Sequence, residues 1–167
     1  MHIRRLAPTD APAYRTLRLR ALREHPEAFT SSHEEDAALP VEQAVQRLGS
    51  LQQRFWGALE DGELLGIVGL ERKPRAKERH KAVVVGMYVA PEHNGRGIGR
   101  QLLEALLADA RAQGIRQLVL TVTQGNGAAM QLYERAGFRS FGVEPRAIQF
   151  DGRFFAKNHM ALALEAK

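Results

Sequence analysis

Three glycines at every second position, Gly95, Gly97 and Gly99, lie in the segment PEHNGRGIGR (residues 91–100). The apolar stretch AVVVGMYVA precedes this segment, and QLLEALLADARAQG, which has helical periodicity, follows it. A glycine-rich turn that opens a helix exposes backbone N–H groups without side chains in the way, and the N-terminus of the helix carries partial positive charge. The segment therefore predicts a binding site for a phosphate group.

Two common nucleotide-binding patterns do not fit this segment. A P-loop requires Gly-x-x-x-x-Gly-Lys followed by Ser or Thr, and the sequence contains no such string. The dinucleotide pattern Gly-x-Gly-x-x-Gly, counted from Gly95, meets Arg100 at its last position, and LTVTQGN (120–126) lacks the expected acidic residue. A purely structural turn is the remaining alternative, but such a turn seldom needs three glycines.

Most of the chain resembles the GNAT superfamily of N-acetyltransferases, and the resemblance is strongest over residues 83–138. NGRGIG after an apolar strand, a leucine-rich helix, a further strand and NGAAMQLYERAGF occur at the spacing that this family uses. The family's phosphate loop reads Gln/Arg-x-x-Gly-x-Gly/Ala, and its three defined positions are occupied here by Asn94, Gly97 and Gly99. Asn94 departs from that pattern.

The resemblance implies a site for acetyl-CoA as co-substrate, with the diphosphate on the amides of residues 95–100 and the pantetheine arm beside the preceding strand. It also implies a bulge that separates two parallel strands, and Gly86 is the expected position for it. Asn126 fits both a contact with the cofactor and a cap of the later helix, and both roles stay open. The implied cofactor-binding residues are Met87, Tyr88, Val89, Asn94, Gly95, Arg96, Gly97, Ile98, Gly99, Arg100, Asn126 and Tyr133.

Acetyl transfer to an amine requires a neutral amine, a stabilised oxyanion and a proton for the departing thiolate. Tyr133 matches the family tyrosine held near the sulfur, and a phenol with a pKa of about 10 can protonate a thiolate with a pKa of about 8.5. Its spacing also places Tyr133 on the apolar stripe of its helix. The resemblance favours the catalytic role over packing alone.

The acidic segment SSHEED (31–36) lies between two expected helices near the N-terminus. The resemblance implies that this region lines the acceptor pocket, where carboxylates attract a cationic amine. We therefore expect Glu34 and Glu35 to bind the substrate and Glu34 to act as general base. A solvated loop is the alternative for this segment.

The elements that must position these residues follow from periodicity and turn signals. Strands are expected at 2–6, on both sides of Asp61-Gly62, at 81–91, at 116–123 and on both sides of Asp151-Gly152. Helices are expected from 10 to 25, from about 40, from 98 to 113 and from 127 to 136. This order predicts an α/β (α+β) fold: a mixed, mostly antiparallel sheet of about six or seven strands with a central parallel βαβ crossover and helices on both faces.

The composition predicts a single folded domain over residues 1–167, since 44% of the residues are hydrophobic and 26% are charged. The absence of cysteine excludes disulfides and a thiolate nucleophile. The histidines lack metal-ligand spacing, so no metal is expected. We see no secretory signal and no apolar run long enough for a membrane span, which favours a cytoplasmic protein without a membrane partner.

The formal net charge is +5, and six Lys or Arg residues gather in RKPRAKERHK (72–81), called the basic segment below. Such a cluster could attract nucleic acid, but it contains no aromatic residue that would stack on bases. A solvated connection between strands is the favoured interpretation.

The residues and the resemblance together predict an acetyl-CoA-dependent N-acetyltransferase that moves acetyl directly to a primary amine of a small molecule or peptide. A non-catalytic acyl-CoA-binding module and a nucleic-acid-associated protein that uses the basic segment are the alternatives. The sequence does not identify the acceptor, which could be a polyamine, an amino acid, an antibiotic or a protein N-terminus. It also leaves open whether the protein forms a homodimer.

Overall fold

The structure is a computed structural model that describes residues 1–165. No helix in this range combines the length and the apolar composition needed to cross a bilayer. The strands and α-helices are β1 (His2–Arg5), α1 (Ala11–Glu24), α2 (His33–Ala37), α3 (Val41–Leu48), β2 (Gln53–Glu60), β3 (Glu63–Arg72), β4 (Lys81–Val89), α4 (Ile98–Ala112), β5 (Gln117–Thr123), α5 (Gly127–Arg135), β6 (Arg139–Phe150) and β7 (Arg153–Ala163).

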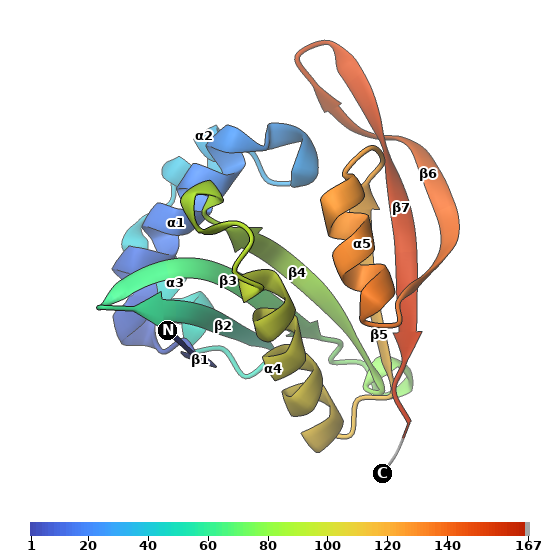
Figure 1. Ribbon diagram of the computed structural model, residues 1–167, viewed down its shortest axis with the longest axis horizontal. Helices are drawn as coiled ribbons and strands as arrows, with labels where there is room; N and C mark the ends of the chain where they lie inside the picture. Colours follow the sequence, from blue (N-terminus) through green and yellow to red (C-terminus); the bar gives the residue numbers. More distant parts are fainter. Residues whose placement is uncertain (166–167) are drawn as a thin grey trace.

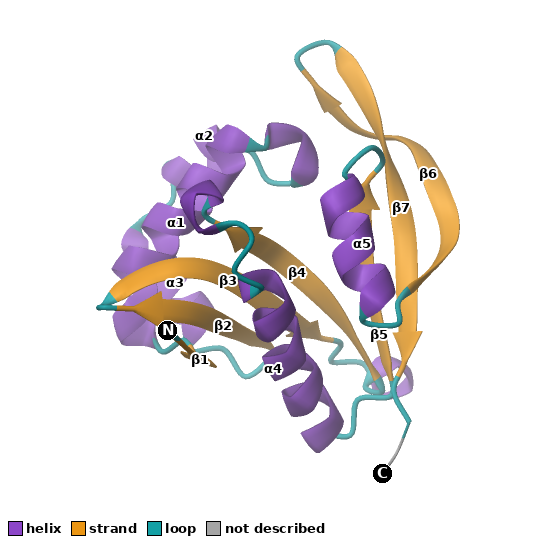
Figure 2. Ribbon diagram, viewed as in Figure 1, coloured by secondary structure: helices purple, strands orange, loops and turns teal. Residues whose placement is uncertain are grey.

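The strands form one seven-stranded sheet in the order β1-β2-β3-β4-β5-β7-β6 (Figure 2). Only the central neighbours β4 and β5 run parallel, and every other neighbouring pair is antiparallel. A parallel pair needs a long crossover connection, which α4 provides here. The predicted mixed sheet with a parallel βαβ unit at its centre is confirmed.

Helices cover both faces of the sheet, as expected. One apolar cluster joins α4 and α5 to the sheet, and it includes Leu102, Leu106 and Tyr133. A second cluster joins α1 and α3 to the other face, and it includes Tyr14 and Leu48. Figure 1 shows α4 and α5 in front of the sheet and α1 and α3 behind it.

Two details of the N-terminal helices differ from the expectation. The sequence pattern of the helix expected from about residue 40 predicts that Val45 points inward, but the structure leaves it 39% exposed. The acidic segment is not a loop, because residues 33–37 form α2. Ser32 caps this helix, and its Oγ accepts a hydrogen bond of 3.1 Å from the backbone N–H of Glu35. Such a cap satisfies an N–H group that lacks a partner inside the helix.

The parallel strands β4 and β5 diverge after a short paired stretch. Their pairing covers only residues 81–83 of β4 and 117–119 of β5. Farther along β4, the register with β3 shifts by one residue, and Gly86 has φ = +63°, a conformation that favours glycine. The expected bulge at Gly86 is therefore confirmed, and it leaves one side of β4 without a strand partner.

Candidate functional site

The N-terminus of α4 is formed by the glycine loop. Gly97 is the N-cap residue with φ = +73°, and no side chain caps the helix. The first helical bond runs from the N–H of Gln101 to the oxygen of Gly97. Within residues 1–165, the backbone N–H groups of residues 95–100 donate no hydrogen bond, so they remain available to an anionic ligand.

A groove of about 730 Å³ extends from this loop between α4 and α5, and it is called the outer groove below. The structure brings most of the predicted cofactor residues to its wall. These are Met87, Tyr88, Val89, Asn94, Gly95, Gly97, Ile98, Gly99, Arg100 and Asn126.

Two predicted cofactor residues have side chains engaged elsewhere. The guanidinium of Arg96 donates to Glu60, and Arg96 does not line the outer groove. The ring of Tyr88 packs in the cluster beneath α1, and its hydroxyl donates to Glu24. Burial, together with the bond to the Glu24 carboxylate, raises the pKa of Tyr88 above its usual value.

A second cavity, of about 360 Å³, lies where β4 and β5 diverge and reaches α1 and α3; it is called the inner cavity below. Its wall includes Tyr133 from α5 and Glu71 from β3. The outer groove and the inner cavity meet at residues that line both. These are Ala28, Phe29, Met87, Asn126 and Ala129.

Tyr133 is nearly buried, with 7% of its surface exposed, and its ring packs edge-on against Phe138 at 5.8 Å between centroids. Burial raises the pKa of its phenol above the usual value because the charged form loses hydration. The hydroxyl forms no hydrogen bond with any residue in 1–165. The phenol is therefore protonated at neutral pH, and Tyr133 lines the inner cavity with its donor unused within this range.

Asn126 caps α5, since its Oδ1 accepts a hydrogen bond of 3.2 Å from the N–H of Ala129. The structural role that the sequence allowed for Asn126 is thus confirmed. Its position on the wall of both cavities leaves the contact with a cofactor as a prediction.

The structure does not bring Glu34 or Glu35 to either cavity. Both side chains are exposed on α2, and Glu35 accepts a hydrogen bond of 3.0 Å from the Ser32 hydroxyl. Among the described residues that line the inner cavity, Glu71 is the one carboxylate. The sequence interpretation missed it because Glu71 stands at the end of an otherwise apolar strand, beside the basic segment.

A face of α5 was also missed. Ala128, Gln131, Leu132 and Arg135 line the outer groove. Their spacing of three, four and seven residues is that of one helical face, which is the signal that could have identified them. Leu132 also belongs to the apolar stripe predicted for this helix, and Ala129 and Ala136 of that stripe line the outer groove as well.

The basic segment lies at the other end of β4 from the glycine loop, as Figure 1 shows. Its residues, 72–81, line neither the outer groove nor the inner cavity. Residues 1–165 also contain no group of three or more acidic or histidine side chains placed to hold a metal ion.

Comparison with known proteins identifies several relatives of this chain. L-methionine sulfoximine/L-methionine sulfone acetyltransferase of Pseudomonas aeruginosa is 39% identical over 79 residues, which is 47% of this chain and 46% of that protein. Mycothiol acetyltransferase of Geodermatophilus obscurus is 33% identical over 138 residues, which is 81% of this chain and 43% of that protein. The chain therefore spans about half the length of the curated relatives it matches.

Solved structures agree over almost the whole chain. A GNAT-family acetyltransferase from Streptococcus pneumoniae has a TM-score of 0.87 at 26% identity, covering 98% of this chain and 99% of that chain. The Salmonella typhimurium protein yncA, solved with its cofactor acetyl-CoA, has a TM-score of 0.88 at 23% identity, covering 100% of this chain and 95% of that chain. The latter likeness shows a shared fold.

The model of the acetyltransferase (GNAT) family matches residues 17–138, a range that includes α1, the diverging strands, the glycine loop and Tyr133. The chain belongs to the acetyltransferase (GNAT) family.

Proposed function

We propose that this chain is an acetyl-CoA-dependent N-acetyltransferase that transfers acetyl directly to a primary amine of a small molecule or peptide. One observation carries the proposal. The groove that begins at the uncapped glycine loop meets, at the divergence of β4 and β5, a cavity lined by Tyr133, whose hydroxyl has no hydrogen-bond partner among residues 1–165.

The glycine loop fits the diphosphate of acetyl-CoA. The free N–H groups of residues 95–100 supply hydrogen bonds to phosphate oxygens, and the dipole of α4 favours negative charge there. No acidic residue lies in the first turn of α4 to oppose that charge. When bound, acetyl-CoA supplies the acetyl group as a reactive thioester.

The side of β4 that β5 leaves free supports the rest of the cofactor. Residues 87–89 follow the bulge at Gly86 and border the outer groove, so an extended arm can lie beside them as a partial extra strand. Backbone N–H groups on this side of β4 are positioned to bind the acetyl oxygen.

Two side chains in the inner cavity take the proton-transfer roles. Tyr133 holds a proton at Oη and donates it to the departing sulfur. Glu71 is proposed, through water, to accept the proton that the amine nitrogen loses. We propose direct transfer, since the chain has no cysteine thiolate to carry an acetyl group.

The proposed acceptor class draws on the relatives. One is named for methionine sulfoximine and methionine sulfone, and another, 35% identical over 108 residues, is the N-alpha-acetyltransferase RimI of Mycobacterium tuberculosis. Amines of small molecules and of peptides are therefore the acceptors to test first.

The test measures thiol release from acetyl-CoA with a panel that contains L-methionine sulfone, a short peptide with a free N-terminus, and spermidine. We expect release with at least one amine, together with a matching acetylated product by mass spectrometry. Calorimetry with CoA and NAD accompanies it, and only CoA is expected to bind. Binding of CoA without turnover of any amine would support a non-catalytic acyl-CoA-binding module.

A further inference from the structure

The inner cavity has a strongly cationic wall. Arg18 from α1, Arg47 from α3 and Lys157 from β7 line it, against the single carboxylate of Glu71 among the described residues there. A cavity that received only a cationic amine would gain from the opposite balance of charge. The wall therefore indicates a negative group on the acceptor.

Arg18 is held firmly and presents one free nitrogen toward the reaction region. Its Nε donates to Asp36 at 2.6 Å and its Nη2 donates to the Ser31 hydroxyl at 3.2 Å. Nη1 makes no hydrogen bond within residues 1–165, and it lies 3.9 Å from the position that a Cβ on Gly86 would occupy. The free N–H groups of Arg18 therefore stand beside the bulge of β4.

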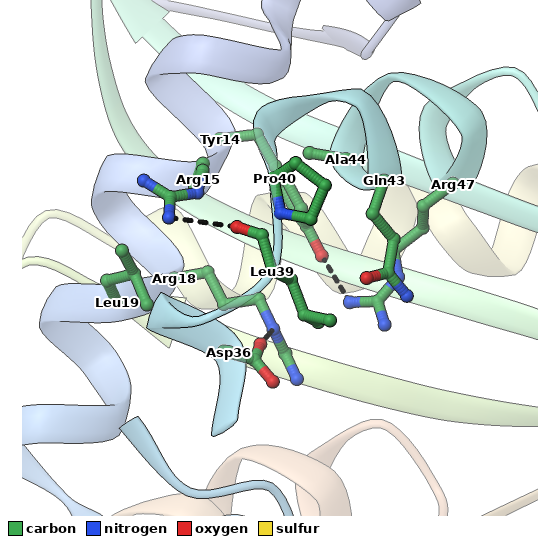
Figure 3. Close-up of a pocket in the computed structure, with 10 residues that line it drawn as sticks. All are labelled: Tyr14, Arg15, Arg18, Leu19, Asp36, Leu39, Pro40, Gln43, Ala44 and Arg47. Carbon is green, nitrogen blue, oxygen red and sulfur yellow. Dashed lines mark hydrogen bonds and ion pairs between the residues drawn. The ribbon is translucent and has the colours of Figure 1, made fainter. Parts of the chain in front are cut away.

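The positive charge of Arg47 has fewer hydrogen-bonding partners than that of Arg18. It donates one hydrogen bond, of 3.2 Å, to the hydroxyl of Tyr14, and Figure 3 shows this bond beside the pair of Arg18 and Asp36. In the part of the chain that the structure describes, no carboxylate oxygen lies within 4 Å of its guanidinium nitrogens.

The guanidinium of Arg47 is half-buried, and most of its donors have no partner there. Burial lowers the pKa of Arg47, but Tyr14, Asp36 and Glu71 together raise it above its usual value, so the group stays charged. A buried charge with unused donors is costly, and a planar carboxylate matches a guanidinium in a two-bond geometry.

We infer that the acceptor is a free α-amino acid whose carboxylate binds between Nη1 of Arg18 and the guanidinium of Arg47. This inference rests on the proposed function. Only two carbon atoms separate the nitrogen of an α-amino acid from its carboxylate oxygens, so a carboxylate on Arg18 places the amine at the bulge of Gly86. Phe29, Phe55 and Val85 on the same wall favour an apolar side chain.

The reaction balances as follows. The neutral amine nitrogen forms a bond to the acetyl carbon, and the bond from that carbon to sulfur breaks. The nitrogen loses one proton, and the sulfur gains one. The products are an N-acetyl amino acid and the free thiol of CoA.

The experiment compares L-phenylalanine with L-phenylalaninamide, which keeps the side chain and the amine but lacks the carboxylate. Rates are compared at equal concentrations of the neutral amine, because the two amines differ in pKa. We expect kcat/KM to be about 10- to 100-fold higher for phenylalanine, the range for hydrogen bonds to a charged group.

Variants then assign the preference to Arg47. Arg47→Met should bring the ratio of the two kcat/KM values close to one, and Arg47→Lys should restore part of it because the charge remains. Arg111→Met removes an equal charge from the exposed last turn of α4 and should keep the full preference. A thermal melt of each variant shows whether the fold is intact.

The possible outcomes distinguish the amino-acid inference from the proposed function. If the amide is acetylated as well as the amino acid, or if only spermidine or a peptide is acetylated, the amino-acid inference is overturned while the proposed function stands. If acetyl-CoA binds and no amine is acetylated, the proposed function falls and the inference falls with it. A preference that survives in a folded Arg47→Met also overturns the inference.

Discussion

A Cβ on Gly99 would lie 3.4 Å from Cδ2 of Leu132, in van der Waals contact, so the first turn of α4 packs closely against α5. This contact closes one wall of the outer groove just behind the glycine loop. A side chain larger than alanine at position 99 would therefore press on Leu132, whereas at Gly97 the positive φ itself favours glycine.

Gly99→Leu should weaken acetyl-CoA binding by about 10-fold or more, because a large side chain there must push α5 away from the groove. Calorimetry with CoA measures the effect. Gly142→Leu is the matched control, since a Cβ at Gly142 in β6 would meet no atom within 4 Å. Equal affinity in both variants would contradict the assignment of the groove.

Tyr133→Phe should lower kcat by about 100-fold, the usual scale for one acid–base group, while the affinity for acetyl-CoA changes little. The ring and its contact with Phe138 remain, so the melting temperature should also stay close to that of the wild type. A kcat within about twofold of wild type, with chemistry shown to be rate-limiting, would remove Tyr133 from the mechanism.

The burial of Tyr133 also predicts a feature of the pH–rate profile. The phenol is active in its protonated form, and its raised pKa moves the loss of that proton to higher pH. The rate should therefore not fall as pH rises toward about 10, the ordinary pKa of tyrosine. This prediction would be contradicted if the rate of the wild type fell with rising pH below pH 10 and the rate of Tyr133→Phe did not.

The two candidate bases can be separated by paired amide substitutions. Glu71→Gln should lower kcat/KM by about 100-fold, because general-base catalysis contributes on that scale. Glu34→Gln should change it by less than about twofold, because the Glu34 side chain is exposed on α2 and lines neither cavity. The reverse ranking would restore Glu34 as the base.

The basic segment should be dispensable for acetyl transfer. Replacing Arg75, Lys77 and Arg79 by Ser should leave turnover of a small amine nearly unchanged, since these residues line neither cavity. A large loss of kcat/KM in steady-state assays would place the segment at a ligand. Salt-dependent retention of the wild type on DNA, lost in the variant, would instead favour a nucleic-acid role.

Local signals in the sequence predicted the elements well. Asp61-Gly62 and Asp151-Gly152 marked both hairpins, and the leucine spacing after the glycine loop marked α4. The helix α2 was missed although Ser32 and Glu35 form the Ser-x-x-Glu signature of a helix start.

The inner cavity could not be predicted in the same way. Arg18, Arg47 and Glu71 come from three elements that are distant in the sequence, and only tertiary packing brings them to one wall. An arginine in an amphipathic helix has the same local pattern whether it faces solvent or a cavity. The glycine loop was different, because its function resides in consecutive backbone groups.

The divergence of β4 and β5 has a consequence for the order of events. The outer groove opens between α4 and α5, whereas the inner cavity is bounded by α1 and α3 on the other face of the sheet. The proposed sites for acetyl-CoA and for the acceptor therefore extend toward different faces of the sheet and meet where β4 and β5 diverge. Such an arrangement favours transfer within a ternary complex, in which the acetyl donor and the acceptor are bound at the same time.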